Sequence, residues 1–340
     1  MSKTILVTGG TGLLGAHLLY HLCSQGHMVK ATKRASSSLD LVQKIFAYYQ
    51  SADQSFLKNI EWQEVELDDV LALSEALEDV NYLYHCAATV SFNPRKRKQL
   101  TQNVEITSCV VNAALAAKVD KLVHVSSVAA LGRAKQGSLI DESSQWTSST
   151  ENSVYAESKY WAELEVWRGM EEGLNAVIVN PCIILGPGPW SSGSTAIFGK
   201  VAKGFKFYTH GENAYVDARD VSRAMHLLME STISHNRFVL AAENWSYRKM
   251  FGRIAKAIGA KEPTVLAKPW MGKIVWRIEK WRSFLLGSDP MITKETAKTA
   301  HQVNRYNGSK ICEAVNFRYR GLEETVEDIA GFYKEEHKLS

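Results

Sequence analysis

The sequence predicts an α/β protein in which a doubly wound parallel sheet is followed by a smaller C-terminal domain. Short apolar, β-branched segments alternate with helical patterns through the first half of the 340 residues. The predicted strands are residues 5–7, 28–32, 82–86, 122–125 and 176–179. Strands that alternate with helices form βαβ units, and helices then cover both faces of a parallel sheet.

The segment between the first two predicted strands has the spacing of an amphipathic helix. Leu14, Leu18, Leu19 and Leu22 recur at helical intervals, and Gly26 supplies a C-terminal stop. Strand, helix and strand therefore follow one another within the first 32 residues.

A change of pattern after Pro181 marks the predicted domain boundary. Glycine and proline are frequent in residues 186–193, and mixed helical and strand segments follow. We expect residues 1–180 to form the first domain, with part of 210–242 returning to it. Residues 181–340 would mainly bind substrate, over the carboxyl ends of the strands where open α/β sheets bind their ligands.

Composition excludes several classes of protein. The net charge of +4 is small and the basic residues are dispersed, apart from a run at 95–98 that we interpret as a solvated helix start, so no nucleic-acid partner is expected. Five scattered cysteines without a CxxC pair fit neither a disulfide framework nor a zinc site. No signal-peptide core and no apolar run long enough to span a membrane is present, which predicts a cytoplasmic protein.

A glycine-rich turn follows the first strand. Gly9, Gly12 and Gly15 are spaced as GxxGxxG and lead into the first helix. Gly9 would permit the tight turn, Gly12 the close approach of a pyrophosphate, and Gly15 close packing of helix and strand, while the helix N-terminus attracts the anion. Such turns also occur for purely structural reasons, but this position predicts a dinucleotide-binding Rossmann domain. The predicted contacts are Gly9, Thr11, Gly12, Leu13, Leu14 and Gly15.

The end of the second strand indicates which dinucleotide binds. NAD-binding proteins usually carry an acid there for the ribose 2′-hydroxyl, whereas this chain has Lys33 and Arg34. Cationic side chains suit a 2′-phosphate, which predicts NADP(H) in preference to NAD(H). The alternative is that both residues belong to an ordinary solvated loop.

Tyr155 and Lys159 form a YxxxK pair within a helical pattern. Residues four apart lie on one helix face, so the ammonium would neighbour the phenol and lower its pKa. Ser127, just after a central strand, could donate a hydrogen bond to the same substrate oxygen, or could simply cap a helix. The three side chains together favour carbonyl reduction, with Tyr155 as proton donor.

These motifs, in this order, resemble the extended short-chain dehydrogenase/reductase family, and the dihydroflavonol reductase-like branch within it. Further matches are at 85–88, 103, 180–181, 186–188 and 216–221. The resemblance implies that Ser127, Tyr155 and Lys159 are catalytic and that Lys159 also holds the nicotinamide ribose. It implies further cofactor contacts, with Glu66 a departure from the usual Asp: Glu66, Leu67, Ala87, Ala88, Asn103 and Pro181. It also implies a possible homodimer through the helices near Asn103 and Tyr155.

Two other functions stay open beside NADPH-dependent reduction of a ketone or aldehyde, or its reverse, without a metal. Nucleotide-sugar epimerases share the architecture, and a cofactor-binding sensor or scaffold would lack turnover. Sugar dehydratases are disfavoured because Val128 and Ala129 follow Ser127 where those enzymes have Asp and Glu.

An aromatic, partly basic stripe at residues 270–285 has helical spacing. Such a stripe is most often core. It could instead line an apolar substrate pocket or lie on a membrane surface.

Overall fold

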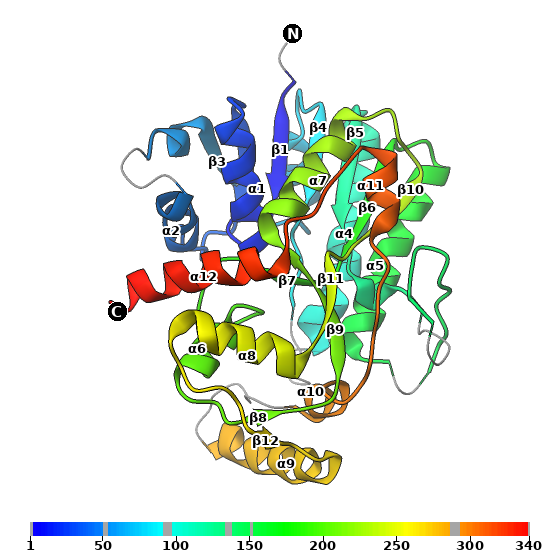
Figure 1. Ribbon diagram of the computed structural model, residues 1–340. Coiled ribbons are helices and arrows are strands. Elements are labelled where there is room, and N and C mark those ends of the chain that lie inside the picture. The colour runs from blue at the N-terminus through cyan, green and yellow to red at the C-terminus, as the bar shows by residue number, and fades with distance from the viewer. Residues whose placement is uncertain are drawn as a thin grey trace.

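A seven-stranded parallel sheet forms the centre of the computed structural model, which describes residues 3–49, 54–90, 97–132, 138–149, 152–285 and 293–338. The strand order is β10-β6-β5-β4-β1-β2-β3 (Figure 1). The strands are β1 Ile5–Thr8, β2 Val29–Lys33, β3 Ile60–Glu64, β4 Tyr82–His85, β5 Lys121–Val125, β6 Ala176–Pro181 and β10 Asn236–Leu240. The predicted fold class is confirmed.

The predicted strands agree with the structure to within two residues at each end, but β3 and β10 were not among them. β3 lies at the sheet edge, and only Ile60 of its five residues is buried, so the sequence there has no apolar run. Met28 and Cys86 fall outside the strands to which they were assigned.

Helices cover both faces of this sheet. One face carries α1 (Leu13–Ser24), α2 (Asp40–Tyr49), α7 (Ala218–Glu230) and α11 (Ser309–Ala314). The other carries α3 (Val70–Ala76), α4 (Arg97–Ala117) and α5 (Val154–Glu171). The central strands contribute to both cores because successive side chains point to opposite faces, as with Leu6 on one side and Ile5 and Val7 on the other.

One helix terminus was predicted at its true position, and a second agrees with the prediction as far as the described residues go. Helix α1 ends at Ser24, and Gly26 takes the left-handed conformation (φ +87°) that favours glycine. Helix α4 begins at Arg97, where Arg97 and Lys98 are exposed, so the basic run ends in a solvated helix start; residues 95 and 96 lie outside the described ranges.

The strand order reverses between β1 and β4. Successive strands run outward from β1 through β2 to β3, and outward from β4 through β5 to β6 on the other side. Open α/β sheets bind ligands at the carboxyl ends of the two strands where the order reverses. The ends of β1 and β4 therefore mark the expected cofactor crevice.

A smaller layer follows β6. A sheet of order β11-β9-β7 contains β7 (Ile183–Leu185), β9 (Glu212–Asp217) and β11 (Glu243–Ser246). Helices α6 (Ala196–Ala202), α8 (Tyr247–Ile258) and α12 (Leu322–Glu336) share a third core with it. Strand β10 returns from this half of the chain to the large sheet. The division at residue 180 remains a prediction.

At the lower end of Figure 1 lies a third group of elements, formed by β8 (Phe207–Tyr208), β12 (Val265–Leu266), α9 (Pro269–Leu285) and α10 (Lys294–Thr299). The interpretation of the stripe at 270–285 as core is wrong for its largest described side chains. Trp270, Ile274, Ile278 and Trp281 are all at least half exposed. The side chains of residues 284 and 285 are outside the described part of the structure. None of the described helices is long and apolar enough to cross a membrane.

Candidate active site

The turn after β1 requires glycine at its first position. Gly9 has φ +71°, and a Cβ placed on it would lie 2.6 Å from the Ala87 nitrogen. Ala87 belongs to the loop after β4, so the glycine turn and this loop are in direct contact at the point where the strand order reverses. The two predicted cofactor segments thus meet.

The other two glycines of the motif have different surroundings. A Cβ on Gly15 would lie 2.1 Å from the Gly9 carbonyl oxygen, so the turn itself excludes a side chain there. Gly12 is exposed, and the only neighbour of its Cβ would be the Gly9 oxygen at 3.4 Å. Gly12 therefore leaves space above the turn that a side chain would fill.

The first turn of α1 presents free backbone donors to that space. Gly12 caps the helix without a side-chain hydrogen bond, and the first intrahelical bond runs from Ala16 N to Gly12 O. The amides of Leu13, Leu14 and Gly15 precede that bond, and the first turn holds no acidic residue. The residues present therefore fit a dinucleotide pyrophosphate. The side chain of Leu14 is buried in the core, so only its backbone faces this space.

Lys33 and Arg34 lie at the carboxyl end of β2 as expected. The Lys33 ammonium is 3.4 Å from a carboxylate oxygen of Glu64 on β3, and the Glu64 side chain is well exposed. Arg34 is exposed, and its backbone nitrogen donates to the Ser37 hydroxyl (3.2 Å), which fixes the turn. Lys33 thus already has a weak, solvent-screened partner, and Arg34 projects into solvent.

Glu66 and Leu67 follow β3 and differ in environment. Glu66 is exposed and its carbonyl accepts from Asp69 N (3.0 Å), whereas Leu67 packs against the core on the α4 side of the sheet. The hydrogen bond between Asp69 N and Glu66 O fixes the backbone of this turn. Among the described residues, no contact joins the Glu66 carboxylate to the glycine-rich turn after β1.

Asn103 acts on the loop after β4 rather than lying open to a ligand. Its side chain is buried, accepts from Thr89 N (2.8 Å) and donates to Thr89 O (3.0 Å). It also reaches the Ser158 hydroxyl on α5 at 3.4 Å. Asn103 therefore connects α4 to the loop after β4, through Thr89, and to the helix that carries Tyr155, through Ser158.

Ser127 caps a short helix, which is one of the two roles considered for it. Its hydroxyl oxygen accepts from Ala129 N (3.1 Å) and so caps the short 3₁₀ helix Val128–Ala130. The same hydroxyl hydrogen-bonds the Tyr155 side chain. The cap fixes the oxygen of Ser127 at the end of β5, and α5 brings the phenol to it.

The pKa of Tyr155 shifts in the direction opposite to the one expected. Burial raises the pKa of the phenol, and the hydrogen bond from Ser127 opposes this only in part. The sequence argument counted the nearby ammonium and omitted desolvation, which disfavours the charged phenolate. Tyr155 is consequently a neutral phenol near pH 7.

Lys159 is buried one helical turn from Tyr155. Its ammonium donates to the carbonyl of Val125 at 2.9 Å. Burial lowers the pKa of Lys159 to about 8, while Glu163 and Cys86 act in the opposite direction. The side chain therefore remains mostly protonated at neutral pH.

Glu163 is a buried acid that the sequence argument missed. Its carboxylate accepts from Ser126 (2.6 Å), Asn180 (2.7 Å) and Arg237 (3.1 Å). Asn180 also donates to Ser127 O at 3.0 Å, beside Pro181 at the end of β6. The spacing of Lys159 and Glu163, four residues apart on one helix, was a usable signal. No sequence pattern near Arg237, on β10, indicated that it would contact this acid.

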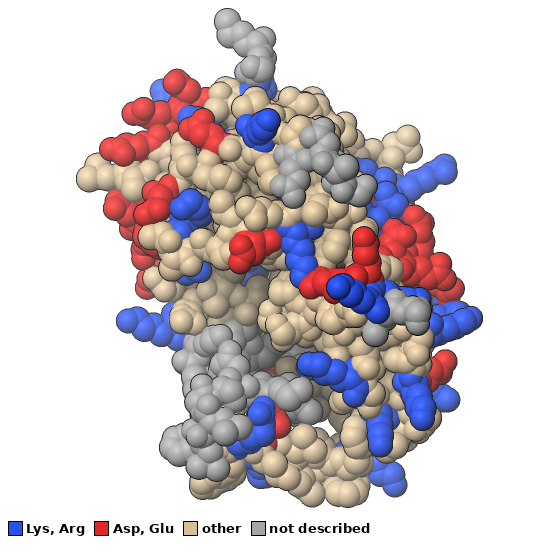
Figure 2. Space-filling view, turned by 90° about the vertical axis from the view of Figure 1, so that its left-hand side faces the viewer, with Lys and Arg blue, Asp and Glu red and all other residues tan. Residues whose placement is uncertain are grey.

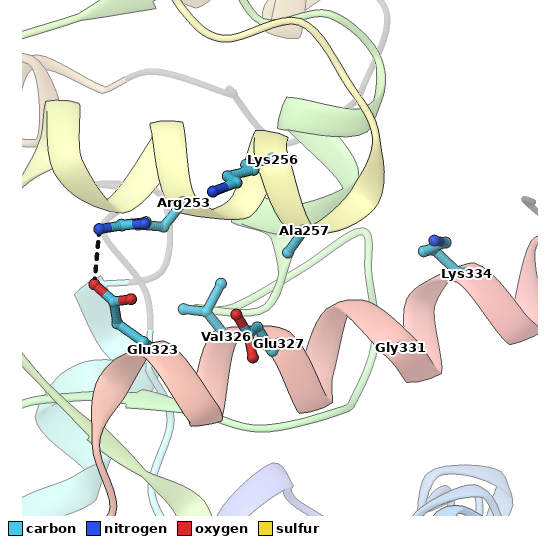
Figure 3. Close-up of a pocket in the computed structure, with 8 residues that line it drawn as sticks. All are labelled: Arg253, Lys256, Ala257, Glu323, Val326, Glu327, Gly331 and Lys334. Carbon is cyan, nitrogen blue, oxygen red and sulfur yellow. Dashed lines mark ion pairs between the residues drawn. The ribbon is translucent and has the colours of Figure 1, made fainter.

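A groove of about 400 Å³ between α8 and α12 lies apart from these residues (Figure 3). Arg253 and Glu323 form an ion pair across it at 2.9 Å, and Lys256, Glu327 and Lys334 also line it. The mixed charges give it no preference for an anion. None of the predicted site residues lines it.

Comparisons with known proteins agree with this arrangement. The NAD-dependent epimerase/dehydratase family matches residues 5–241. A protein of Synechocystis sp., provisionally named dihydroflavonol 4-reductase, is 28% identical over 98% of this chain and 95% of its own length. Cinnamoyl-CoA reductase 1 of Arabidopsis thaliana is 28% identical over 70% of each chain. The crystal structure of gox2253 superposes with a TM-score of 0.80, 27% identity and complete coverage of both chains.

The family match covers well over half of the chain and includes the glycine turn, Ser127, Tyr155 and Lys159. The chain thus belongs to the NAD-dependent epimerase/dehydratase family, in the dihydroflavonol reductase-like branch of the extended short-chain dehydrogenases/reductases, and is an NAD(P)-dependent oxidoreductase.

Proposed function

We propose that this enzyme reduces a ketone or aldehyde with NADPH, or catalyses the reverse oxidation, through Ser127, Tyr155 and Lys159. The observation that carries the proposal is the hydrogen bond between the Ser127 hydroxyl and the Tyr155 phenol, one helical turn from the buried ammonium of Lys159. This is the donor set that a carbonyl oxygen needs as it gains negative charge.

The bound nicotinamide supplies hydride chemistry, and this chain supplies binding, orientation and a proton. The open first turn of α1 would hold the pyrophosphate. Lys159 would hold the nicotinamide ribose through its ammonium. The resemblance adds the residues at the ends of β3, β4 and β6 as further contacts.

Ser127 and Tyr155 have different roles at the carbonyl oxygen of the substrate. The capped hydroxyl of Ser127 orients and polarises that oxygen, since its position is fixed by Ala129 N. The neutral phenol of Tyr155 then delivers a proton to it. Lys159, mostly protonated near neutrality, stabilises the phenolate that Tyr155 becomes.

Four finer points belong to the same proposal. Lys33 and Arg34 favour NADP(H) over NAD(H). The substrate is a small molecule bound mainly by residues 181–340. A second copy of the chain pairs through α4 and α5, and the enzyme works in the cytoplasm. Each rests on the sequence pattern or on the resemblance.

A panel of aldehydes and ketones, followed at the NADPH absorbance, tests the proposal directly. Tyr155→Phe should reduce turnover by about 10²- to 10⁴-fold, the usual contribution of a general acid, with the affinity for NADPH nearly unchanged. Tyr160→Phe is the matched control, because Tyr160 lies on the same helix and its ring, which the substitution keeps, stacks on Trp146 at 4.4 Å.

Three outcomes would contradict the proposal. Tyr155→Phe could retain most of the activity, which removes the phenol from the chemistry. Alternatively, cofactor could bind with no oxidation of NADPH across the whole panel, which would favour the sensor or scaffold. Interconversion of nucleotide sugars with no net change in NADPH would favour the epimerase.

A further inference from the structure

Helix α9 has its apolar side chains on the outside of the molecule. Large apolar residues recur along one exposed stripe: Trp270 (58% exposed), Ile274 (50%), Ile278 (61%) and Trp281 (69%). Their spacing of four, four and three residues places all of them on one helix face. Exposed apolar patches of this kind mark interaction sites far more often than scattered single residues do.

The inner face of α9 combines small and polar residues with the partly buried ring of Trp276. Gly272 lies against Ala297 of α10, and a Cβ on Gly272 would be 3.5 Å from that residue. Ser283 is buried, and Glu279 pairs with Arg282 at 2.9 Å and is close enough to Lys200 of α6 for their charges to interact. The four large apolar side chains of the stripe therefore face away from the rest of the molecule, whereas Glu279 packs inward.

A row of basic side chains borders the apolar stripe. Lys273, Arg277 and Lys280 are exposed and lie on the helix face next to Trp270 and Trp281. The single acid of α9, Glu279, faces inward. In Figure 2 the lower end of the molecule is mainly tan and blue, whereas most acidic side chains gather in the upper half.

The apolar surface continues beyond α9. Phe207 of β8 and Val265 of β12 are cross-strand partners, and both are 40% exposed. β12 ends only a few residues before α9 begins, and both lie at the same end of the molecule (Figure 1). Apolar side chains from two neighbouring elements thus share this end.

We infer that α9 docks the enzyme on the surface of an anionic lipid bilayer. Such a surface offers negative charge to the basic row and an acyl boundary to the apolar stripe, and tryptophans are favoured at that depth. A second copy of this chain fits less well, because a twofold contact would bring two basic rows together with no exposed acid on α9 to pair them. Docking is interfacial, since no described helix, α9 included, is long and apolar enough to cross a membrane.

The docked helix is linked to the candidate active site. α9 packs on α10, and Glu295 of α10 hydrogen-bonds Ser153, the N-cap residue of the helix that carries Tyr155. A surface bound by α9 therefore holds the site in a fixed orientation to the lipid.

Co-sedimentation of the full chain with vesicles tests this inference. We expect binding to an equal mixture of phosphatidylserine and phosphatidylcholine, little binding to phosphatidylcholine alone, and weakening by salt. Lys273→Gln/Arg277→Gln/Lys280→Gln should weaken binding on the order of a hundredfold, since each basic residue near an anionic surface contributes about a fivefold factor. The control with equal loss of charge is Lys30→Gln/Lys58→Gln/Lys118→Gln, at the opposite end of the sheet.

The apolar stripe is tested separately. Trp270→Ser/Trp281→Ser should abolish binding, while Met28→Ser, which removes a side chain that is 63% exposed before β2, should not. Trp270→Phe/Trp281→Phe should keep binding but lose most of the tryptophan quenching by brominated lipid.

Three results would overturn the inference. The chain could fail to bind both kinds of vesicle, or could bind both equally. It could also form a dimer in the absence of lipid that Trp270→Ser/Trp281→Ser dissociates in analytical ultracentrifugation, which would make the stripe an interface between copies.

Discussion

The ammonium of Lys159 donates a hydrogen bond to the carbonyl of Val125, 2.9 Å away, in the last residue of the strand that leads to Ser127. A helix and a strand that are far apart in the sequence are thus joined at the candidate site. The bond also fixes where the positive charge lies relative to the Ser127 and Tyr155 pair.

Affinity for NADPH should fall as pH rises through about 8, because burial lowers the pKa of Lys159 to that value. Below it the side chain is a charged ammonium, and above it a neutral amine that holds the ribose less strongly. Fluorescence titration of NADPH across this pH range measures the effect. Lys159→Met should bind about tenfold more weakly and without this pH dependence. Constant wild-type affinity through pH 8 would remove Lys159 from the cofactor site.

Glu163→Gln should destabilise the fold by about 3 kcal/mol, because it leaves the charge of Arg237 without its buried partner. The same change removes a negative charge that raises the pKa of Lys159, so the fall in NADPH affinity should move to lower pH. If Glu163 only stabilised the fold, its replacement would not shift the pH dependence of NADPH affinity. Chemical denaturation and the NADPH titration give the two readouts.

The matched control for this change is Glu165→Gln. Glu165 lies on the same helix and pairs with Arg168 near the surface at 3.0 Å. Its loss should cost well under 1 kcal/mol and leave the pH profile unchanged. Equal effects of the two substitutions would show that burial of the Glu163 network has no special importance.

Local patterns were enough to predict five strands of the large sheet, the glycine turn and the helix that carries Tyr155. Gly9 was recognisable because its turn needs φ above zero, and residues four apart on a helix must share a face. The edge strand β3 was not, because one buried residue of five leaves no periodicity to read.

The remaining features of the site depend on contacts between distant segments. Arg237 reaches Glu163 only because β10 pairs with β6. The sequence predicted that part of 210–242 returns to the first domain, but not the strand it pairs with or the contact it makes. The direction of the Tyr155 pKa depends on how deeply the phenol is buried, which spacing cannot give. Which face of α9 is exposed likewise could not be predicted, because it depends on where α10 and α6 pack against this helix.

Lys33→Ser/Arg34→Ser should weaken NADPH binding about tenfold or more and leave NADH binding nearly unchanged, since charge-assisted bonds to a 2′-phosphate would be lost. Glu64→Gln should strengthen NADPH binding slightly, because Lys33 is then freed from its partner at 3.4 Å. Lys30→Ser, three residues before Lys33 on the same strand, controls for loss of charge on β2. Titrations of each variant with NADPH and with NADH measure both affinities. An equal loss of affinity for the two cofactors would exclude the 2′-phosphate role.

Acid should unfold this protein through its buried histidines. His85 of β4 lies beside His124 of β5, with ring centroids 5.1 Å apart, and hydrogen-bonds the Thr8 hydroxyl at 2.7 Å. Burial lowers the pKa of His85 from 6.5 to about 3, and it lowers the pKa of His124 as well. The unfolded chain therefore binds more protons than the native state between these values.

The free energy of unfolding should consequently be greatest above pH 6.5 and decline below it, by about 1.4 kcal/mol per pH unit for each such histidine until the native pKa is reached. Urea denaturation at a series of pH values measures this slope. His85→Asn should lower stability at neutral pH, because the Thr8 contact is lost, yet reduce the slope by one histidine's share. His210→Asn, at an exposed position, serves as the control. An unchanged slope in His85→Asn would show that protonation of His85 does not drive acid unfolding.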